Sequence, residues 1–355
     1  MTILENVPLA PYTSLGVGGP ARWFVETGNE DEMLDAVRFA RAQSAPYFIL
    51  GGGSNLVVSD AGFPGVVVRV AGEGSVWLDE RNGFGSIVAN AGTDWDAVVR
   101  LAVEKNCAGI ECLAGIPGSV GGTPVQNVGA YGQEVSRSVV SVRAIDLEAE
   151  KVVHLAAAEC GFGYRRSIFN STATGRYVIT RVVYALKLDG KPHLEYRDVK
   201  QHFAQRGVAR PSLAETAAAV RAIRRGKGML LVAGDSDCRS AGSFFKNPVV
   251  PEEYIEPLSV LAKCGEEEVP QYPAGAGYLP ADRAVKLSAA WLMERAGFFK
   301  GFAMGRAGLS SKHVLAIVNL GGATAAEVLA LRDAVTKRVH DNFSIWLEQE
   351  PVILG

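Results

Sequence analysis

The 355-residue sequence lacks an excess of charge of either sign, a long apolar run and a leader-like start. Its 36 Lys and Arg against 38 Asp and Glu give a net charge of -2, which does not indicate a basic nucleic-acid surface. No apolar run approaches the length of a membrane span. The start, MTILENVPLAPYTSLG, has neither the basic nor the apolar region of a secretory signal. We therefore expect a cytoplasmic chain that neither enters a membrane nor binds nucleic acid.

Paired metal or disulfide ligands are also missing. The five cysteines include no C-x-x-C pair, and the five histidines include no H-x-x-x-H pair. An odd, unpaired set of cysteines argues against both a disulfide framework and a zinc site. No G-x-x-x-x-G-K-[ST] motif is present, so a P-loop is unsupported. We expect no structural metal.

One nucleotide-binding pattern occurs in the wrong context. Gly16 to Ala21 matches G-x-G-x-x-A, but no clear strand precedes it and Pro20 leads into a strand. The dinucleotide fingerprint needs a strand, a turn and then a helix. We interpret this match as chance.

Glycine is abundant instead, with 40 residues that cluster between apolar runs. Two clusters stand out, LGGGSNLVVSD from Leu50 and IPGSVGGTPVQNVGAYG from Ile116 to Gly132. Successive glycines serve tight turns, or they let main-chain N–H groups approach a ligand closely. Either cluster alone fits a structural turn equally well. Together, and without charge, they favour a large cofactor whose phosphates and ring rest on the main chain.

Periodicity predicts a mixed α+β chain. Strands are expected at 21–27, 47–50, 65–70 and 177–188, with further strands in SIVANAG, VVSVRAIDL and FSIWLE. Helices are expected after the capping pairs Asn29/Glu32, Ser212/Glu215 and Thr324/Glu327, after Thr93, and at Val285–Ala296. We divide the chain into 1–70, 71–215 and 216–340, with the tail 341–355 returning to the first part.

Seven segments in order carry a family resemblance. They are LGVGGPA, ILGGGSNLVVSD, IPGSVGGTPVQNVGAYG, CGFGYRRSIF, AGSFFKNP, KLSAAWLME and WLEQE. The chain resembles the UDP-N-acetylenolpyruvoylglucosamine reductase family over nearly its whole length, in the type with a longer loop and a substrate-covering tyrosine. The resemblance implies an α+β fold of the vanillyl-alcohol-oxidase (VAO/PCMH) type. Two subdomains, 1–70 and 71–215, would bind FAD non-covalently, and a third α+β domain would bind substrate.

The resemblance also implies the reaction and its residues. A monomer would use NADPH to reduce UDP-N-acetylglucosamine enolpyruvate to UDP-N-acetylmuramate for peptidoglycan synthesis, with hydride delivered from FAD N5. Arg165 and Glu350 would stabilise the enolate, and Ser243 would donate the proton. The FAD-binding residues would be Gly51, Gly52, Gly53, Ser54, Asn55, Leu56, Ile116, Pro117, Gly118, Ser119, Val120, Gly121, Gly122, Gln126, Asn127, Gly129, Ala130, Tyr131 and Arg224. The substrate-binding residues would be Tyr131, Tyr164, Tyr196, Lys227, Lys246, Asn247 and His313.

These residue types suit the chemistry. Hydride addition to an enol ether conjugated to a carboxylate pushes negative charge onto that carboxylate. A guanidinium clamps a carboxylate through two bonds and stays charged. A serine hydroxyl is a weak acid, but an enolate carbon is basic enough to take its proton. Strand periodicity does not distinguish Glu348 from Glu350, because a spacing of two puts both on one face; the family pattern selects Glu350.

Two other readings stay open at the level of sequence. Another flavin oxidase or dehydrogenase of the same fold should lack the set Arg165, Ser243 and Glu350. A non-catalytic protein that binds a nucleotide sugar should have lost Ser243 or Glu350. The chain retains all three residues.

Overall fold

The structure is a computed structural model that describes residues 1–274 and 283–355, without the side chains of 79–81. The chain forms two compact units. Unit 1 comprises Met1–Val7, Ala21–Gly53 and Pro64–Gly226, and unit 2 comprises Pro8–Pro20, Ser54–Phe63 and Lys227–Gly355. One change of unit falls inside the GGGSNL segment, between Gly53 and Ser54. The three-part division expected from the sequence remains a prediction.

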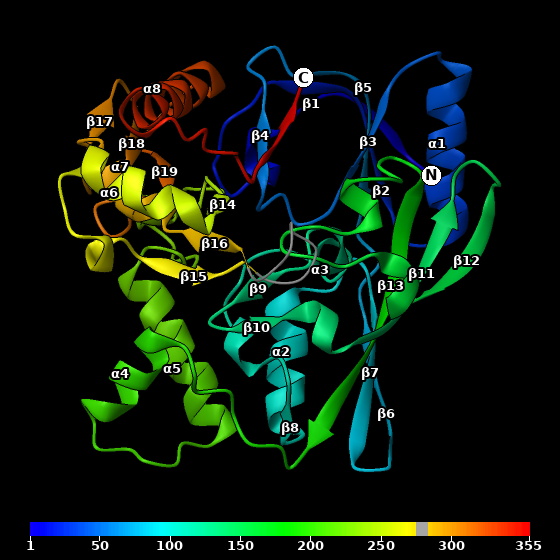
Figure 1. Cartoon of the computed structure of the whole chain (residues 1–355). Coiled ribbons are helices and arrows are strands. Elements are labelled where there is room, and N and C mark those ends of the chain that lie inside the picture. The colour runs from blue at the N-terminus through cyan, green and yellow to red at the C-terminus, as the bar shows by residue number, and fades with distance from the viewer. Residues whose placement is uncertain (275–282) are drawn as a thin grey trace. The chain divides into compact units, whose positions relative to one another are not determined.

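A four-stranded sheet and one helix form the first part of unit 1 (Figure 1). In sheet order the strands are β1 (Ile3–Pro8), β2 (Pro20–Thr27), β5 (Phe63–Val70) and β3 (Tyr47–Leu50). Strands β3 and β5 run parallel, with α1 (Glu30–Ala42) between β2 and β3 in the chain. The predicted cap is confirmed, because the Asn29 side chain accepts from the Glu32 N–H at 3.0 Å. Helix α1 packs Ala36 and Ala40 into a small core with Trp23 and Val25 of β2.

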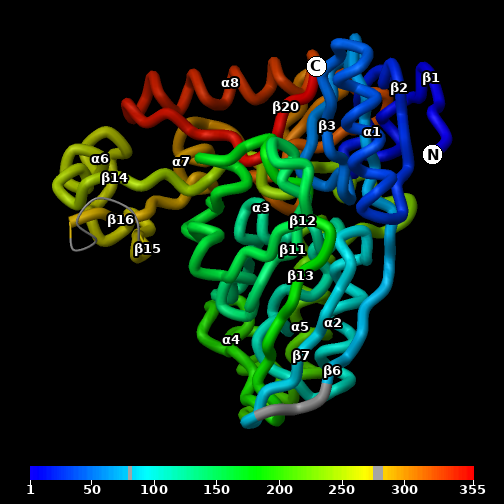
Figure 2. Tube along the Cα trace, turned by 90° about the vertical axis from the view of Figure 1, so that its right-hand side faces the viewer, coloured from blue at the N-terminus to red at the C-terminus, as the bar shows by residue number. Residues whose placement is uncertain are grey.

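A larger antiparallel sheet forms the rest of unit 1 (Figure 2). Its strands are β12 (Lys151–Ala156), β11 (Val139–Asp146), β13 (Tyr177–Leu188), β7 (Phe84–Asn90) and β6 (Ser75–Arg81) in sheet order, with β8 (Cys107–Ala108) also paired to β13. The helices are α2 (Trp95–Glu104), α3 (Gly122–Val125), α4 (Arg197–Ala204) and α5 (Leu213–Gly226). The main core of the unit surrounds Trp95 of α2, which is 1% exposed. Its ring contacts the buried Tyr184 ring of β13 at a centroid distance of 5.6 Å and an angle of 54°.

Unit 2 combines short sheets with three helices. Its sheets are β14 (Val249–Pro251), β16 (Ala284–Leu287) and β15 (Gln271–Pro273); β17 (Ala303–Met304), β18 (Ala307–Leu309) and β19 (Ile317–Asn319); and the parallel pair β4 (Leu56–Val58) and β20 (Val352–Leu354). The helices are α6 (Ile255–Ala262), α7 (Ala289–Arg295) and α8 (Ala325–Phe343). Strand β20 lies beside β4, so a segment near residue 350 completes a pair begun near residue 56 (Figure 1).

The last long helix behaves as its sequence predicts. Thr324 caps α8, and its Oγ1 accepts from the Glu327 N–H at 3.1 Å while Glu327 binds back to the Thr324 N–H at 2.9 Å. The apolar stripe along the helix is fully buried in the core of unit 2; it consists of Val328, Leu331, Val335 and Val339. A capping box and a helical apolar stripe are therefore confirmed here.

Three local predictions are wrong. The helix expected at Val285–Ala296 begins at Ala289, because Ala284–Leu287 pairs with β14 and β15 as strand β16. The residue that caps α2 is Asp94 and not Thr93, whose Oγ1 binds the main chain of Gly74. FSIWLE forms no strand, although Ile345 and Leu347 are buried in alternation. The alternating burial of Ile345 and Leu347 therefore reflects side-chain packing and not a strand in a sheet.

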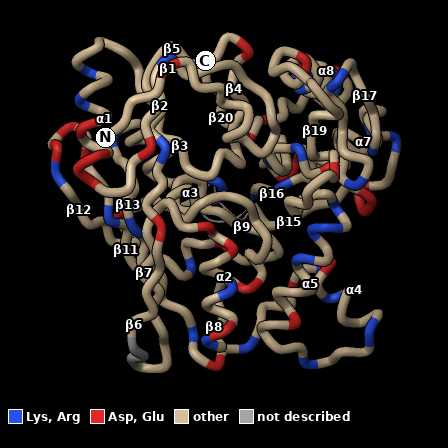
Figure 3. The backbone as a smooth tube through the Cα atoms, turned by 180° about the vertical axis from the view of Figure 1, so that it is seen from behind, with Lys and Arg blue, Asp and Glu red and all other residues tan. Residues whose placement is uncertain are grey.

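Two kinds of feature are absent from the residues that the structure describes. No described helix is long and apolar enough to cross a membrane. No group of three or more His, Cys, Asp or Glu side chains among these residues is arranged to hold a metal ion. Figure 3 shows acidic and basic residues interspersed along both units, as the net charge of -2 suggests.

Candidate active site

The two glycine clusters meet within unit 1. Strand β3 ends at Leu50, and Gly51–Gly53 follow it. A Cβ on Gly52 would lie 2.5 Å from the Cα of Gly118, and one on Gly51 would lie 2.8 Å from the Ser119 Oγ. Real Cβ atoms do not approach that closely, so main chain packs directly on main chain here. This contact explains why the two segments require glycine at facing positions.

Ser119 has a buried hydroxyl group at the junction of the two glycine clusters. Its side chain is 8% exposed, and its Oγ has no hydrogen-bond partner among the described residues. In the same described region, the N–H groups of Gly52 and Ser119 donate to no acceptor. Buried polar groups are nearly always paired, so such a cluster of donors indicates a polar ligand. A cofactor with phosphate oxygens, such as FAD, fits this donor set.

Other amides of the long glycine stretch are already used. Val120 N donates to Thr93 O at 2.9 Å, Gly121 N to Ala91 O at 2.8 Å, and Gly122 N to Ser119 O at 3.0 Å. The first two bonds hold the stretch against residues 91–93, and the third closes a turn within it. The further predicted FAD residues Ile116, Pro117, Gln126 and Ala130 also lie in unit 1. Gly51–Gly53 belong to unit 1 as well, whereas Ser54, Asn55 and Leu56 belong to unit 2.

Two helices pin the entry to the stretch at Gly115. Asp96 of α2 accepts from the Gly115 N–H at 2.7 Å, and Arg224 of α5 donates from Nε to the Gly115 carbonyl at 3.0 Å. Arg221 binds the same Asp96 carboxylate at 2.8 Å. Arg224 is 6% exposed, and burial lowers its pKa while neighbouring Tyr131 and Asp96 oppose that shift. The buried cation therefore lies against the start of the glycine stretch, and its FAD-binding role stays a prediction.

A tight hairpin forms the end of the stretch. Strand β9 (Gly129–Ala130) pairs with β10 (Gln133–Glu134), and Tyr131 and Gly132 form the two-residue turn. Their φ angles are 49° and 83°, the left-handed pair that a type I′ turn needs. The Tyr131 ring is 7% exposed and meets the Tyr196 ring edge-on at a centroid distance of 5.3 Å. Two predicted substrate residues thus touch in unit 1.

A second turn presents Arg165. The main chains of Gly163 and Arg166 exchange two hydrogen bonds, so Tyr164 and Arg165 form the loop between them. Arg165 has a φ of 53°, which costs energy for a residue with a side chain. Its Nη2 donates to the Gly129 carbonyl at 2.8 Å. The proposed catalytic cation is thereby tied to the main chain of the glycine stretch.

Asn127 fastens this turn. It is 1% exposed, and its Nδ2 donates to the Gly163 carbonyl at 2.9 Å and to Glu134 at 3.1 Å. Its Oδ1 accepts from the Ser136 N–H at 3.1 Å. Both ends of the amide are thus occupied by protein groups, so its contact with the turn is structural.

Unit 2 brings the two other catalytic candidates onto neighbouring segments. The Glu350 N–H donates to the Phe244 carbonyl at 2.9 Å, and the Lys246 N–H donates to the Glu348 carbonyl at 2.8 Å. Phe244 is fully buried, whereas the adjacent Ser243 is partly exposed, as is Glu350. Asn55 donates from Nδ2 to the Glu350 carbonyl at 3.2 Å. Asn55 of the GGGSNL segment therefore contacts the main chain of the glutamate that the sequence predicts to be catalytic.

The substrate candidates of unit 2 differ in their surroundings. Lys246 forms an ion pair with Glu348 at 2.5 Å, and the Asn247 Oδ1 accepts from the Ala289 N–H at the start of α7. His313 is partly buried in the turn after Ser310, and Lys227 is the partly buried first residue of its segment in unit 2. Glu348 is 72% exposed at its side chain, which separates it from Glu350.

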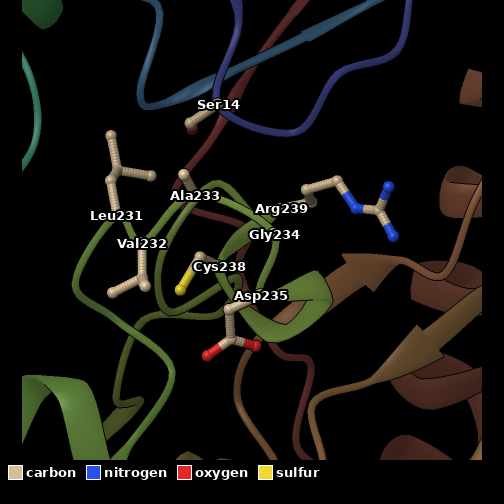
Figure 4. Close-up of a pocket in the computed structure, with 8 residues that line it drawn as sticks. All are labelled: Ser14, Leu231, Val232, Ala233, Gly234, Asp235, Cys238 and Arg239. Carbon is tan, nitrogen blue, oxygen red and sulfur yellow. The ribbon is translucent and has the colours of Figure 1, made fainter.

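A pocket of about 370 Å³ lies in unit 2 on the loop that leads to Ser243 (Figure 4). It is lined by Ser14, Leu231, Val232, Ala233, Gly234, Asp235, Cys238 and Arg239, none of which the sequence predicts as a site residue. Ser14 closes one side, and its hydroxyl donates to the Ser240 carbonyl at 2.6 Å. The pocket lies between Ser14, which directly precedes LGVGGPA, and residues 231–239, which precede AGSFFKNP.

Sequence reasoning missed three buried or half-buried polar residues that bind the glycine stretch and its neighbours. Asp96, Glu111 and Gln133 were not expected at the site, yet each binds the glycine stretch or its neighbours. Glu111 is the one acid in the apolar run CAGIECLAGIPG, and that isolation is the signal that could have identified it.

Comparison with known proteins identifies the family of this chain. Residues 21–156 match the FAD binding domain family, and residues 234–354 match the UDP-N-acetylenolpyruvoylglucosamine reductase, C-terminal domain. The reductase of that name from Thermobifida fusca is 43% identical over 99% of this chain and 98% of its own length. The one from Nocardia farcinica is 45% identical over 100% of this chain and 90% of its own length.

A solved structure of a protein with the same name is also similar to this chain. The crystal structure of UDP-N-acetylenolpyruvylglucosamine reductase from Thermus caldophilus has a TM-score of 0.62 and 28% identity, covering 100% of this chain and 98% of that one. The expected α+β flavin-binding fold and the expected family are confirmed. The chain belongs to the UDP-N-acetylenolpyruvoylglucosamine reductase family of FAD-dependent oxidoreductases.

Proposed function

We propose that this chain reduces UDP-N-acetylglucosamine enolpyruvate to UDP-N-acetylmuramate, with NADPH as the reductant, as a cytoplasmic monomer in peptidoglycan precursor synthesis. Family membership over the full length supports the substrate class. The described cysteines form no disulfide, in keeping with a reducing compartment.

The glycine junction of unit 1 would hold the cofactor. Ser119 and the N–H groups of Gly52 and Ser119 supply polar contacts, and Arg224 supplies a buried positive charge close by. FAD, when bound and reduced by NADPH, supplies the hydride from N5, which no side chain can provide. In the proposal these residues orient the cofactor and exclude water from it.

Arg165 would bind the substrate carboxylate. Charge builds on that carboxylate as the terminal carbon of the enol ether receives hydride. A guanidinium that is already fixed, here by the Gly129 carbonyl, stabilises the charge without reorganising. Tyr164 contributes a ring 5.4 Å from the Arg165 guanidinium carbon.

Ser243 and Glu350 would complete the reaction from unit 2. The Ser243 hydroxyl gives its proton to the carbon beside the carboxylate, because an enolate carbon is a strong base. Glu350 would act with Arg165 on the same developing charge. Their main-chain linkage through Phe244 supports a shared task.

The remaining polar residues would recognise the sugar nucleotide. Lys227 and Lys246 supply positive charge for its diphosphate, and Asn247 and His313 supply hydrogen bonds. Tyr196, which is 41% exposed next to Tyr131, would cover the bound substrate.

The observation that carries the proposal is the hydrogen bond from Arg165 to Gly129. It ties a cation suited to a substrate carboxylate to the stretch suited to a flavin. A reductase needs that proximity, because hydride donor and acceptor must meet.

Anaerobic stopped-flow measurement of flavin absorbance tests the proposal. We expect NADPH to bleach the flavin and UDP-N-acetylglucosamine enolpyruvate to restore it within one turnover. An oxidase of the same fold would be restored by oxygen and not by the sugar nucleotide. Failure of NADPH with success of NADH would overturn only the choice of reductant.

A further inference from the structure

Glu111 is a buried carboxylate that the proposed mechanism does not use. It is fully buried and is the first residue of the short 3₁₀ helix Glu111–Leu113, which follows β8 in the chain. Its Oε2 accepts from the Gly109 N–H at 2.8 Å, and its Oε1 accepts from the Gln133 Nε2 and the His193 N–H, each at 2.8 Å. Among the described residues no cation pairs with it. Burying a carboxylate is costly, so three donors aimed at one group indicate a specific task.

The three donors come from separate segments of unit 1. Gly109 lies beside Glu111 itself, and Gln133 begins β10 of the tyrosine hairpin. His193 lies in residues 189–196, the arm that joins β13 to α4. The carboxylate therefore joins the arm to the hairpin.

Other contacts support the arm elsewhere. Asn106 forms two hydrogen bonds with Asp189 at its start, and Leu194 packs against the main core of unit 1. No helix or strand forms between Leu188 and Arg197. Within residues 191–195 the described hydrogen bonds fall on His193, whose carbonyl accepts from the Cys112 Sγ at 3.2 Å. Both main-chain groups of His193 are thus bound by two consecutive residues, Glu111 and Cys112. The middle of the arm is therefore fixed by hydrogen bonds at His193.

The same point also touches the hairpin directly. Gln133 completes the link, because its Oε1 accepts from the Cys112 N–H at 2.8 Å while its Nε2 binds Glu111. A Cβ on Gly132 would lie 2.5 Å from the His193 Nε2, so the imidazole packs on the turn where only glycine fits. Three residues further on, Tyr196 lies edge-on against Tyr131.

We infer that Glu111, with Gln133, is a positioning residue that holds the arm so that Tyr196 lies against Tyr131 and over the substrate. The inference rests on the proposed role of Tyr196. It assigns the specificity of substrate capture in part to a carboxylate that never touches the substrate.

The test compares Glu111→Gln with Tyr196→Ala and the double variant. An amide keeps the shape of Glu111 but replaces one acceptor oxygen by a donor that faces an N–H group. We expect Glu111→Gln to raise the sugar-nucleotide concentration for half-maximal flavin reoxidation about tenfold, a typical effect of losing such a bond. Flavin reduction by saturating NADPH should change less than about twofold.

A double-mutant cycle distinguishes a positioning role of Glu111 from a general loss of stability. If Glu111 acts through Tyr196, Glu111→Gln should add nothing in the Tyr196→Ala background. Amide hydrogen exchange should rise in residues 189–196 of Glu111→Gln. The matched control is Asp146→Asn, which alters a buried carboxylate of unit 1 that also accepts two main-chain N–H groups, away from the arm. It should lose stability without changing half-saturation.

The outcomes are distinct. Additive effects, or an unchanged half-saturation in Glu111→Gln with a clear effect of Tyr196→Ala, overturn the positioning role alone. An unchanged half-saturation in Tyr196→Ala overturns the proposed cover and this inference with it. If Glu111→Gln does not fold with flavin bound, Gln133→Ala replaces it, with the same expectations.

Discussion

The main-chain N–H of Glu350 donates to the carbonyl oxygen of Phe244 at 2.9 Å, which ties the segment of Glu350 to the residue directly after Ser243. Two side chains proposed to act on the same developing charge are therefore joined through one backbone contact in unit 2. Their contributions can still be separated, because only the serine would transfer a proton.

Removal of the Ser243 hydroxyl should affect one half of the catalytic cycle. We expect Ser243→Ala to slow flavin reoxidation by the sugar nucleotide about 10²–10⁴-fold, the usual range for a lost proton donor. Flavin reduction by NADPH should stay nearly unchanged, because no proton from Ser243 is needed there. Stopped-flow absorbance measures both halves separately. Equal damage to both would contradict the acid role.

Glu350→Ala should slow the same half-reaction about 10²–10³-fold, because it removes a group proposed to stabilise the developing charge. Glu348→Ala is the matched control, since Glu348 lies two residues away with a side chain that is 72% exposed. It loses only an exposed ion pair and should change the rate by no more than about fivefold. Similar losses in the two variants would show that the choice of Glu350 is mistaken.

Asn127 should matter for Arg165 without touching substrate. Asn127→Ala removes the amide that holds the Gly163 carbonyl, so the strained turn of Arg165 should relax. We expect kcat to fall about 10–100-fold through misplacement of the guanidinium. Asn319→Ala is the control, because Asn319 is a buried asparagine with four main-chain hydrogen bonds in unit 2. It should lower the melting temperature but keep kcat per bound flavin. A comparable loss of kcat in both would refute the special role of Asn127.

Stability should depend on Glu30 in acid. Its two hydrogen bonds from Arg143 are the main cause that lowers the pKa of Glu30 from 4.5 to about 2. A lowered pKa in the folded state stabilises the fold above about pH 4.5, and this contribution is lost as the pH falls through 2. Glu30→Gln should thus lower the melting temperature by about 2–4 °C at pH 7, with the difference shrinking toward pH 2. Calorimetry at several pH values measures it, and a constant difference would contradict the linkage.

Thiol reactivity should separate Cys264 from the other cysteines. Cys107, Cys112, Cys160 and Cys238 are buried, whereas Cys264 is partly exposed. Burial raises the pKa of Cys160 to about 11 and also raises the pKa of Cys112, so few thiolates exist at pH 8. We expect a thiol reagent to label Cys264 first in the native protein and the others only after unfolding. Cys264→Ser should remove the fast phase; a fast phase that persists would contradict the burial.

The parts of the fold that the sequence predicts are those that depend on local contacts. The caps Asn29, Ser212 and Thr324 were predictable because each bonds within four residues of itself. Strand β16 was not, because Ala284–Leu287 became a strand through pairing with β14 and β15, which lie apart from it in the chain. The apolar pattern of Val285–Ala296 fitted a helix, and tertiary pairing overrode it.

The same limit applies to the site. The glycine clusters were visible because glycine has few uses, and their facing contact explains the residue type. Glu111 was not identified, because its donors Gln133 and His193 lie 22 and 82 residues away. A carboxylate among apolar residues indicates only that hydrogen-bond donors must surround it, and not which residues supply them.

The pairing of β20 with β4 has a consequence for how the enzyme is made. Asn55 binds the Glu350 carbonyl across 295 residues, and Val352–Leu354 forms the strand that accompanies Leu56–Val58. A nascent chain that lacks residues 350–354 cannot form the hydrogen bond of Asn55 or the β4–β20 pair. Interrupted synthesis should therefore yield a protein with the glycine junction of unit 1 but without catalytic turnover, and proteolytic loss of the same few residues would inactivate the mature enzyme.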